Sequence, residues 1–410
     1  MHRNNKTKLI KGTKMKKSIL SLIAVICTYA GFTQQTDTSA YSNLAGSMMA
    51  NNSKLTIGGY AQIDYNQPYK SDEYSLGTLD VHRMVLMFGY KFNQRTQFIT
   101  ELEMEHVSEV YVEQAFLNYQ VNPFLNFRAG LLLVPMGISN EYHEPTTFNG
   151  VERPVIDEKI SPTTWREIGF GLTGTVPSAS FKYQLYVING FNGYDADKGA
   201  LLSGPNGLRS GRQKGAESYM SSPNVTCRAE YFGFKGLNLG LSGYAGNTQS
   251  YLFKGLDKTD EAARAQADSS VVTLAMVGLD ARYTFKGLQL KGQFYYTGLK
   301  DADRYNAFTG KDLGSALMGY YAEACYNVFR NFSSIESGLV PFIRFEHYNM
   351  HQKVGVTETA KDALNVNVLT TGLGWKITTG SMLKADVQMV KSKADSEYVK
   401  TFNAGVAIMF

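Results

Sequence analysis

The stretch TFNAGVAIMF, residues 401–410, alternates between two kinds of side chain. Its apolar side chains fall on every second position, at Phe402, Ala404, Val406, Ile408 and Phe410. The residues between them include Thr401, Asn403 and Gly405. Because successive side chains of a β-strand point to opposite faces, this pattern predicts a strand with one fully apolar face.

The same two-residue alternation recurs along the chain. The composition, with 39 Gly, 26 Tyr and 23 Phe but only 10 Pro, is typical of a β-rich, turn-rich protein. No window shows a long apolar repeat of 3.6 residues. Sixteen segments are predicted to be strands: 54–66, 79–92, 96–106, 110–121, 124–133, 165–176, 180–189, 224–232, 237–246, 271–285, 288–299, 315–327, 339–349, 364–377, 382–391 and 398–410.

The connections between these segments alternate in length. Tight turns such as FNQRT, VNP, VPSAS and ITTGS follow even-numbered segments, whereas longer polar loops follow most odd-numbered ones. A sheet with short turns on one rim and long loops on the other is an up-and-down meander, and an even number of strands closes it. We therefore predict one closed, antiparallel all-β barrel rather than several small β domains.

Charged and apolar residues take opposite faces of the predicted strands. Glu101 and Glu103, for example, alternate with Leu102 and Met104. A water-soluble sandwich would also alternate, so this pattern alone does not decide the class. Three features favour a transmembrane barrel: aromatic residues at the strand ends, closure by an even number of strands, and an export signal at the start of the chain. Its outer face must then be apolar, since Lys or Arg facing lipid at mid-depth costs about 2–4 kcal/mol.

The first residues read as a signal for export. Residues 1–33 combine a basic start, a short apolar run and small residues near its end, and Met15 is a second candidate initiator. They hold seven of the 41 Lys and Arg and no acid, which leaves 34 basic against 36 acidic residues, a net charge of −2. This balance removes the argument for a nucleic-acid partner. We expect a short periplasmic segment over 34–53 and an outer-membrane barrel over 54–410.

The parity of each strand predicts which charged residues line the lumen. Cys227 should face lipid and Cys325 the lumen, on separate strands, so we expect no disulfide. A shift of one residue would turn a strand's whole set outward. The predicted pore-lining residues are Glu101, Glu103, Arg128, Lys182, Arg228, Glu230, Asp280, Arg282, Lys291, Arg344, Glu346, Lys384 and Asp386.

One connection differs from all others. Residues 134–164 form an irregular segment with prolines and both charge signs, well beyond the ordinary length of a connection. Irregular backbone is tolerated at membrane depth where it lines water or is buried in protein, so we expect this loop to fold inward and narrow the channel. The alternative is a loop lying over the outer mouth. The residues expected to set the field at the constriction are Glu144, Glu152, Arg153, Lys159, Arg166 and Glu167.

Several stretches, in their order, resemble the phosphate-selective porin O and P family of Bacteroidetes-type outer membranes. They are GGYAQIDYN, HRMVLMFGYKFNQRTQFITELEME, VEQAFLNYQVNPFLNFRAGLLLVPMG, TWREIGFGLTG and YVINGFNG, within residues 55–195. The resemblance implies a trimeric porin in the outer membrane of a Gram-negative bacterium, passing small ionic or polar solutes by diffusion. The acidic balance and the uncharged LLLVPMG depart from the family, so phosphate or another anion stays one option for the solute.

The C-terminal stretch adds a second resemblance. A final strand with Phe402, Val406 and Ile408 on one face and a terminal Phe410 resembles the C-terminal signal of Gram-negative outer-membrane proteins. The resemblance implies recognition by the barrel-assembly machinery. A buried final strand would give the same alternation.

Other functions find less support in the residues. The histidines His82, His106, His143, His347 and His351 form no recognisable catalytic or metal motif, so we expect no enzyme, no cofactor and no metal. The acidic pairs at Asp195/Asp197 and Asp301/Asp303 lack further oxygen ligands for Ca²⁺. An interaction protein is the alternative function, with loops 191–222 and 247–270 as its binding surface, although these loops hold few aromatic anchors.

Overall fold

The computed structural model describes residues 42–69, 73–332, 334–356 and 358–410. They belong to one compact unit, Thr38–Phe410. The predicted signal peptide, 1–33, and the start of the predicted periplasmic segment, 34–41, lie outside the described residues. No described helix is long and apolar enough to cross a membrane.

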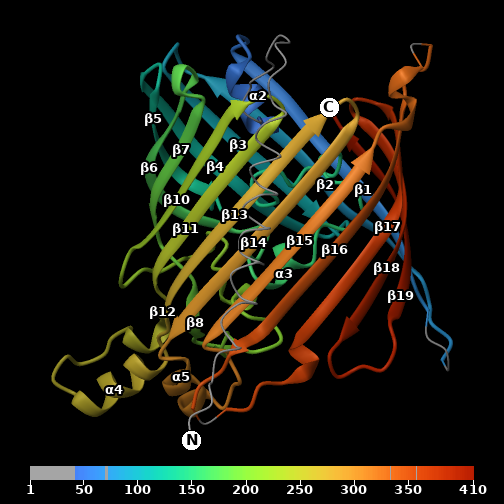
Figure 1. Cartoon of the computed structure of the whole chain (residues 1–410). Coiled ribbons are helices and arrows are strands. Elements are labelled where there is room, and N and C mark those ends of the chain that lie inside the picture. The colour runs from blue at the N-terminus through green and yellow to red at the C-terminus, as the bar shows by residue number, and fades with distance from the viewer. Residues whose placement is uncertain (1–41, 70–72, 333, 357) are drawn as a thin grey trace, which may run out of the picture. The chain divides into compact units, whose positions relative to one another are not determined.

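Sixteen strands form one closed antiparallel barrel in which β1 pairs with β19 (Figure 1), as the alternation predicts. Neighbours along the chain are neighbours in the sheet. The strands are β1 Leu55–Tyr69, β2 Thr78–Lys91, β3 Thr96–Glu105, β4 Glu109–Asn122, β5 Leu125–Leu133, β6 Arg166–Val176, β7 Phe181–Ile188, β10 Asn224–Phe234, β11 Leu237–Asn247, β13 Thr273–Phe285, β14 Leu288–Lys300, β15 Ala316–Tyr326, β16 Gly338–Lys353, β17 Asn365–Thr378, β18 Ser381–Ser392 and β19 Val399–Met409.

The two faces of the barrel follow the predicted parity. In β10, Thr226, Arg228 and Glu230 are buried, whereas Val225 and Tyr231 are exposed. Large apolar side chains are exposed along the strands, among them Leu117, Phe170, Leu241, Leu279, Ile343 and Leu383. A barrel with charges inside and an apolar outer surface is the arrangement that lipid requires. The cysteines follow the same parity, with the free thiols of Cys227 exposed and Cys325 buried.

The barrel closes at a seam between its first and last strands. Ile63 of β1 lies opposite Val406 of β19. Beyond the end of β19, the backbone N–H of Phe410 donates to the Gly59 carbonyl at 2.9 Å, and the Gly59 N–H donates to the Phe410 carbonyl at 3.0 Å. The seam is therefore hydrogen-bonded as far as the final residue.

The long-loop rim contains structure that the alternation does not predict. A small sheet joins β8 Asn192–Asp195, β9 Gly199–Ala200 and β12 Gln249–Ser250. These strands are too short to show a period in the sequence. Helices α4 Glu261–Ser269 and α5 Ala302–Thr309 lie at the same rim (Figure 1). Short 3₁₀ helices occur in the long loops at Arg209–Gly211, Tyr251–Phe253 and Asp362–Leu364, and in turns of the other rim at Pro177–Ala179 and Val328–Asn331.

A short helix, α2 Leu44–Ala50, lies in the short-turn mouth of the barrel, at the end where the chain terminates (Figure 1). It packs against β1, β2 and β3, and its Ala45 and Met48 side chains are buried. Asn43, which caps its start, donates from Nδ2 to the Glu141 carbonyl at 2.8 Å. The helix thus contacts the segment that follows β5, far along the chain.

Candidate channel constriction

The long connection after β5 folds into the barrel. Most of residues 134–164 are buried, and helix α3 Ile156–Lys159 lies within them. The segment makes hydrogen bonds and ion pairs with inward-facing side chains on opposite walls. The prediction of an inward-folded loop is confirmed, and we call residues 134–164 the constriction loop.

One wall holds the loop through basic side chains that bind its carbonyl groups. Lys384 of β18 donates from Nζ to the carbonyls of Pro145, Phe148 and Gly150 at 2.5, 2.7 and 2.9 Å. Lys291 of β14 donates from Nζ to the Thr147 carbonyl at 2.8 Å. The carbonyls of an irregular loop have no strand partner, so buried ammonium groups satisfy them in its place.

The opposite wall holds the loop through ion pairs between charged side chains of the wall and charged side chains of the loop. Glu141 of the loop lies 3.4 Å from Arg228 of β10, measured from Oε2 to Nε. His143 places its Nε2 3.0 Å from Oε2 of Glu113 in β4 and 3.5 Å from Oε1 of Glu101 in β3. Burial alone would lower the pKa of His143, but Glu113 and Glu101 raise this pKa to about 10. His143 is therefore protonated at neutral pH and forms an ion pair with the two carboxylates.

Asp157 links α3 to β14, the strand that also carries Lys291. It accepts hydrogen bonds from Ser139 and from the Tyr295 hydroxyl of β14, the latter at 2.7 Å. Burial raises the pKa of Asp157 to about 7, against an ordinary value of 3.8. The carboxyl group is therefore partly neutral near pH 7.

The charged residues predicted to line the pore all lie on the inner side of the barrel. Most are paired with one another across or along strands: Arg228 with Asp280 at 2.8 Å, Arg282 with Glu230 at 2.8 Å, and Arg344 with Glu346 at 2.8 Å. Much of this charge is thus enclosed between the wall and the loop. Contact of these residues with a passing solute stays a prediction.

The residues predicted to set the field at the constriction are not brought together as one opposed set. Arg166 pairs with Glu113 of the wall at 3.4 Å. Glu167 accepts from Trp165 Nε1 at 2.7 Å. The remaining members also contact different parts of the chain. Glu144 accepts a hydrogen bond from the Leu44 N–H, Glu152 accepts one from Asn66, and Lys159 forms an ion pair with neighbouring Glu158. Burial together with nearby Arg83 lowers the pKa of Arg153 to about 10.

Two of the residues that hold the loop were missed by the parity rule. Glu113 is fully buried, as is its neighbour Gln114. The β3–β4 register passes from Glu101↔Gln114 directly to Leu102↔Val112, which leaves Glu113 as the extra residue of a bulge. A bulge re-aims one side chain and breaks the two-residue period. His143 lies in irregular chain, where no period exists.

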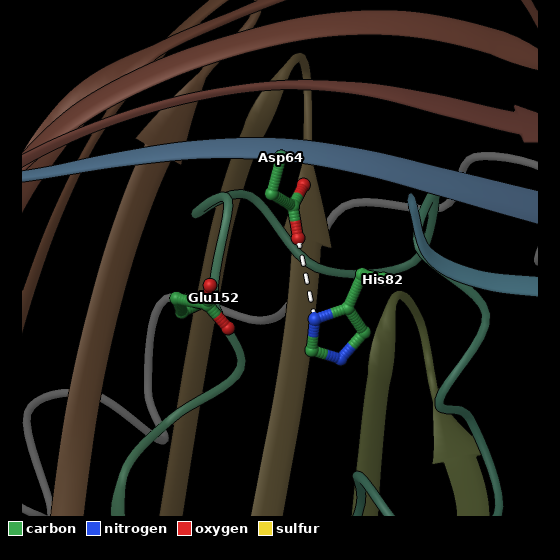
Figure 2. Close-up of side chains that lie close together, drawn as sticks. All are labelled: Asp64, His82 and Glu152. Carbon is green, nitrogen blue, oxygen red and sulfur yellow. Dashed lines mark ion pairs between the residues drawn. The ribbon is translucent and has the colours of Figure 1, made fainter. Parts of the chain in front are cut away.

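A second cluster of ionisable side chains lies where β1, β2 and the loop meet. Figure 2 shows Asp64, His82 and Glu152 facing one another, with the ion pair from His82 Nδ1 to Asp64 Oδ2 at 3.6 Å. The other ring nitrogen of His82, Nε2, lies 3.0 Å from Nη2 of Arg83. Arg83 therefore already occupies Nε2 of His82, whereas Nδ1 faces Asp64 at more than hydrogen-bond distance.

Open space remains beside α2 at the short-turn mouth. One cavity of about 270 Å³ lies between α2, the loop and β4–β7, and its lining includes Arg128, Lys182 and Glu141. A second, of about 330 Å³, includes Lys91, Arg95 and again Arg128. Basic side chains outnumber acidic ones along both linings. We call this space the basic vestibule.

Comparison with known proteins supports the architecture. No protein-family model matches the chain. A protein of Aquifex aeolicus (strain VF5), described as uncharacterized, is 29% identical over 366 residues, which cover 87% of this chain and 80% of that protein.

Solved structures of outer-membrane channels share the fold. The channel DcaP of Acinetobacter baumannii superposes with a TM-score of 0.57 at 11% identity, covering 87% of this chain and 97% of that one. An anion-selective porin from Comamonas acidovorans superposes with a TM-score of 0.56 at 13% identity, covering 87% of this chain and 99% of that one. OmpF of Salmonella typhi superposes with a TM-score of 0.53 at 12% identity, covering 87% of this chain and 97% of that one. Identities this low show a common fold. The fold and the apolar outer surface are together those of a transmembrane β-barrel.

Proposed function

We propose that this protein is a porin, a barrel through which small ionic or polar solutes diffuse across the outer membrane. The observation that carries the proposal is the constriction loop, which enters the lumen and is bonded to opposite walls. Irregular chain fixed inside a barrel of this strand count narrows a water-filled lumen. The fold of the solved porins supports the same function.

We further propose a preference for anions, exerted in the basic vestibule. Arg128 borders both cavities. It donates to Asn118 at 2.9 Å and lies over the Phe116 ring at 5.0 Å. Within the described part of the chain, no acidic side chain forms an ion pair with Arg128, Lys91 or Arg95. Uncompensated charge on the wall of a narrow aqueous space raises the local concentration of counter-ions. Phosphate is one candidate, in keeping with the sequence resemblance to the phosphate-selective porin O and P family.

A reversal-potential measurement tests both steps. In a planar bilayer with a salt gradient, the wild type should give stable open-channel current steps. Its zero-current potential should have the sign expected when anions are more permeant than cations. The Arg128→Glu variant should move this potential toward cations. Lys286→Glu is the matched control, because Lys286 is exposed in the β13–β14 turn at the same rim. If the zero-current potential of Arg128→Glu equals that of the wild type, the basic vestibule does not set the anion preference. If the wild type shows no conductance, the protein is not a porin.

The oligomeric state belongs to the same proposal. One solved structure with this fold, OmpT of Vibrio cholerae, is described in a trimer form and has a TM-score of 0.51. We propose a homotrimer inserted by the barrel-assembly machinery. Mass measurement of the detergent-solubilised, unheated protein tests the trimer.

A further inference from the structure

The side chains of Glu101, Glu113 and His143 enclose one point between the barrel wall and the constriction loop. Glu101 comes from β3, Glu113 from the bulge in β4, and His143 from the loop. Their exposed fractions are 1%, 0% and 3%. One ligand-type atom from each of the three lies within 4.8 Å of the others. Two carboxylates thus share an enclosed position with one imidazole.

The orientation of His143 is that of a metal-binding imidazole. Its Nδ1 lies 3.1 Å from the Asn140 carbonyl, which can only accept a hydrogen bond, so Nδ1 carries a proton. Nε2 is the nitrogen that points at the carboxylates. It is buried and makes no hydrogen bond of acceptable geometry, although Glu113 Oε2 is 3.0 Å away. Metal-bound histidines characteristically donate their other N–H to a backbone carbonyl or a carboxylate in this way.

The carboxylates are oriented by further side chains. Glu101 Oε1 accepts from the Tyr60 hydroxyl at 2.7 Å, and Oε2 accepts from Gln114 Nε2 at 2.6 Å. Glu113 Oε1 accepts from Arg166 at 3.4 Å. The outer oxygens are thus held by amide and guanidinium donors, while Glu101 Oε1 and Glu113 Oε2 face Nε2. Such outer partners fix ligands in metal sites.

The spacing of the facing atoms suits a small divalent ion. Nε2 lies 3.0 Å from Glu113 Oε2 and 3.5 Å from Glu101 Oε1. Ligands of a tetrahedral Zn²⁺, with bonds of about 2.1 Å, lie roughly 3.4 Å apart. One nitrogen and two carboxylate oxygens form a donor set that Zn²⁺ accepts. The Tyr60 hydroxyl lies 2.7 Å from Glu101 Oε1 and 3.5 Å from Glu113 Oε2.

We infer that Glu101, Glu113 and His143 form a structural site for a divalent metal ion of the zinc class, which fastens the constriction loop to strands β3 and β4. Its three ligands come from two strands and the loop, so the ion links parts of the chain that the backbone does not connect directly. On binding, the ion replaces a proton at Nε2. The site does not depend on which solute the channel passes.

Zinc content tests the site directly. The protein is purified without a histidine tag, dialysed against dilute ZnCl₂ and then against metal-free buffer, and its zinc is measured by elemental analysis. The wild type should retain about one zinc per chain, and His143→Gln should bind zinc at least tenfold more weakly. His82→Gln is the matched control, since His82 also faces two carboxylates but its Nε2 is already occupied by Arg83.

A second measurement uses the wild type alone, in case His143→Gln fails to fold. Co²⁺ bound to one nitrogen and carboxylate oxygens gives a visible absorption band, which Zn²⁺ should abolish by displacement. The inference is overturned if the wild type retains no zinc and shows no Co²⁺ band, because the cluster is then an ion pair with a protonated histidine. It is also overturned if His82→Gln, rather than His143→Gln, loses the zinc.

Discussion

The ammonium group of Lys384 lies 3.9 Å from the centre of the Phe148 ring and donates to the Phe148 carbonyl at 2.7 Å. One strand residue thus binds both the backbone and the side chain of the loop. Its further bonds to the carbonyls of Pro145 and Gly150 make it the main attachment of the loop to β18. A desolvated ammonium over an aromatic ring adds about 2 kcal/mol to such an attachment.

Replacing this lysine should release the loop on one side. Lys384→Met keeps the length of the side chain but removes all three hydrogen bonds, each worth about 1.5–3 kcal/mol when the donor is charged. We expect noisier, larger single-channel currents and faster proteolysis within residues 134–164. Lys376→Met is the control, because Lys376 is partly buried on neighbouring β17 and, in the described structure, has no hydrogen bond to the loop. Equal behaviour of the two variants would contradict this role.

Removing the loop should widen the channel. Deleting residues 139–163, with a short Gly-Ser join, should raise single-channel conductance several-fold because the segment occupies the lumen. Deletion of residues 251–269, which include α4 at the outer rim, serves as the control of similar length and should leave conductance near that of the wild type. Unchanged conductance after the first deletion would mean that ions follow a route that the loop does not narrow.

Thiol labelling can locate water inside the barrel. In a Cys227→Ser/Cys325→Ser background, Arg128→Cys should react with a water-soluble thiol reagent, since Arg128 borders the basic vestibule. Glu346→Cys should not react, because Glu346 is fully buried against the loop, where it accepts from the Ile156 N–H at 3.2 Å. Deleting the loop should make Glu346→Cys reactive. Labelling of both sites in the full chain would contradict the enclosed wall.

The terminal phenylalanine should be required for assembly. Deleting Phe410 removes both backbone hydrogen bonds to Gly59 at the seam. We expect a marked fall in the heat-modifiable, folded form recovered from outer membranes. Phe410→Tyr keeps the backbone and an aromatic ring, so it should assemble at the wild-type level. Normal recovery after the deletion would show that the seam closes without this residue.

The stability of the loop attachment should depend on pH through Asp157. Its pKa is raised from 3.8 to about 7, so the protonated form is favoured in the folded state. Stability from this group is complete below about pH 4 and is lost as the pH rises through 7. The effect is at most of the order of 4 kcal/mol, at about 1.4 kcal/mol per pKa unit. Ser139, Tyr295, Glu346 and Arg344 are the groups that face Asp157 and influence its pKa.

Thermal unfolding of the wild type and Asp157→Asn in detergent, between pH 4 and pH 8, measures this dependence. The asparagine variant should gain stability relative to the wild type as the pH rises. Because every other titrating group is common to both proteins, the difference between the two curves isolates Asp157. Parallel curves would show that Asp157 does not titrate in this range.

The barrel could be predicted from the sequence because its strands alternate apolar and polar side chains with a period of two residues. Segment 398–410 and β19 Val399–Met409 differ by one residue at each end. The site could be predicted only in part. The length and irregularity of 134–164 indicated an inward loop, but its partners depend on contacts between distant segments, as between Lys384 and Pro145. Glu113 was missed because a bulge breaks the strand period.

The seam between β1 and β19 has a consequence for how the chain folds. Tyr60 pairs with Met409, so the contact that completes the barrel joins residues almost 350 positions apart. Until it forms, both terminal strands present unpaired edges, which are templates for aggregation. Contacts of such high sequence separation also make folding slow. The barrel therefore cannot close before both of its terminal strands are available to pair.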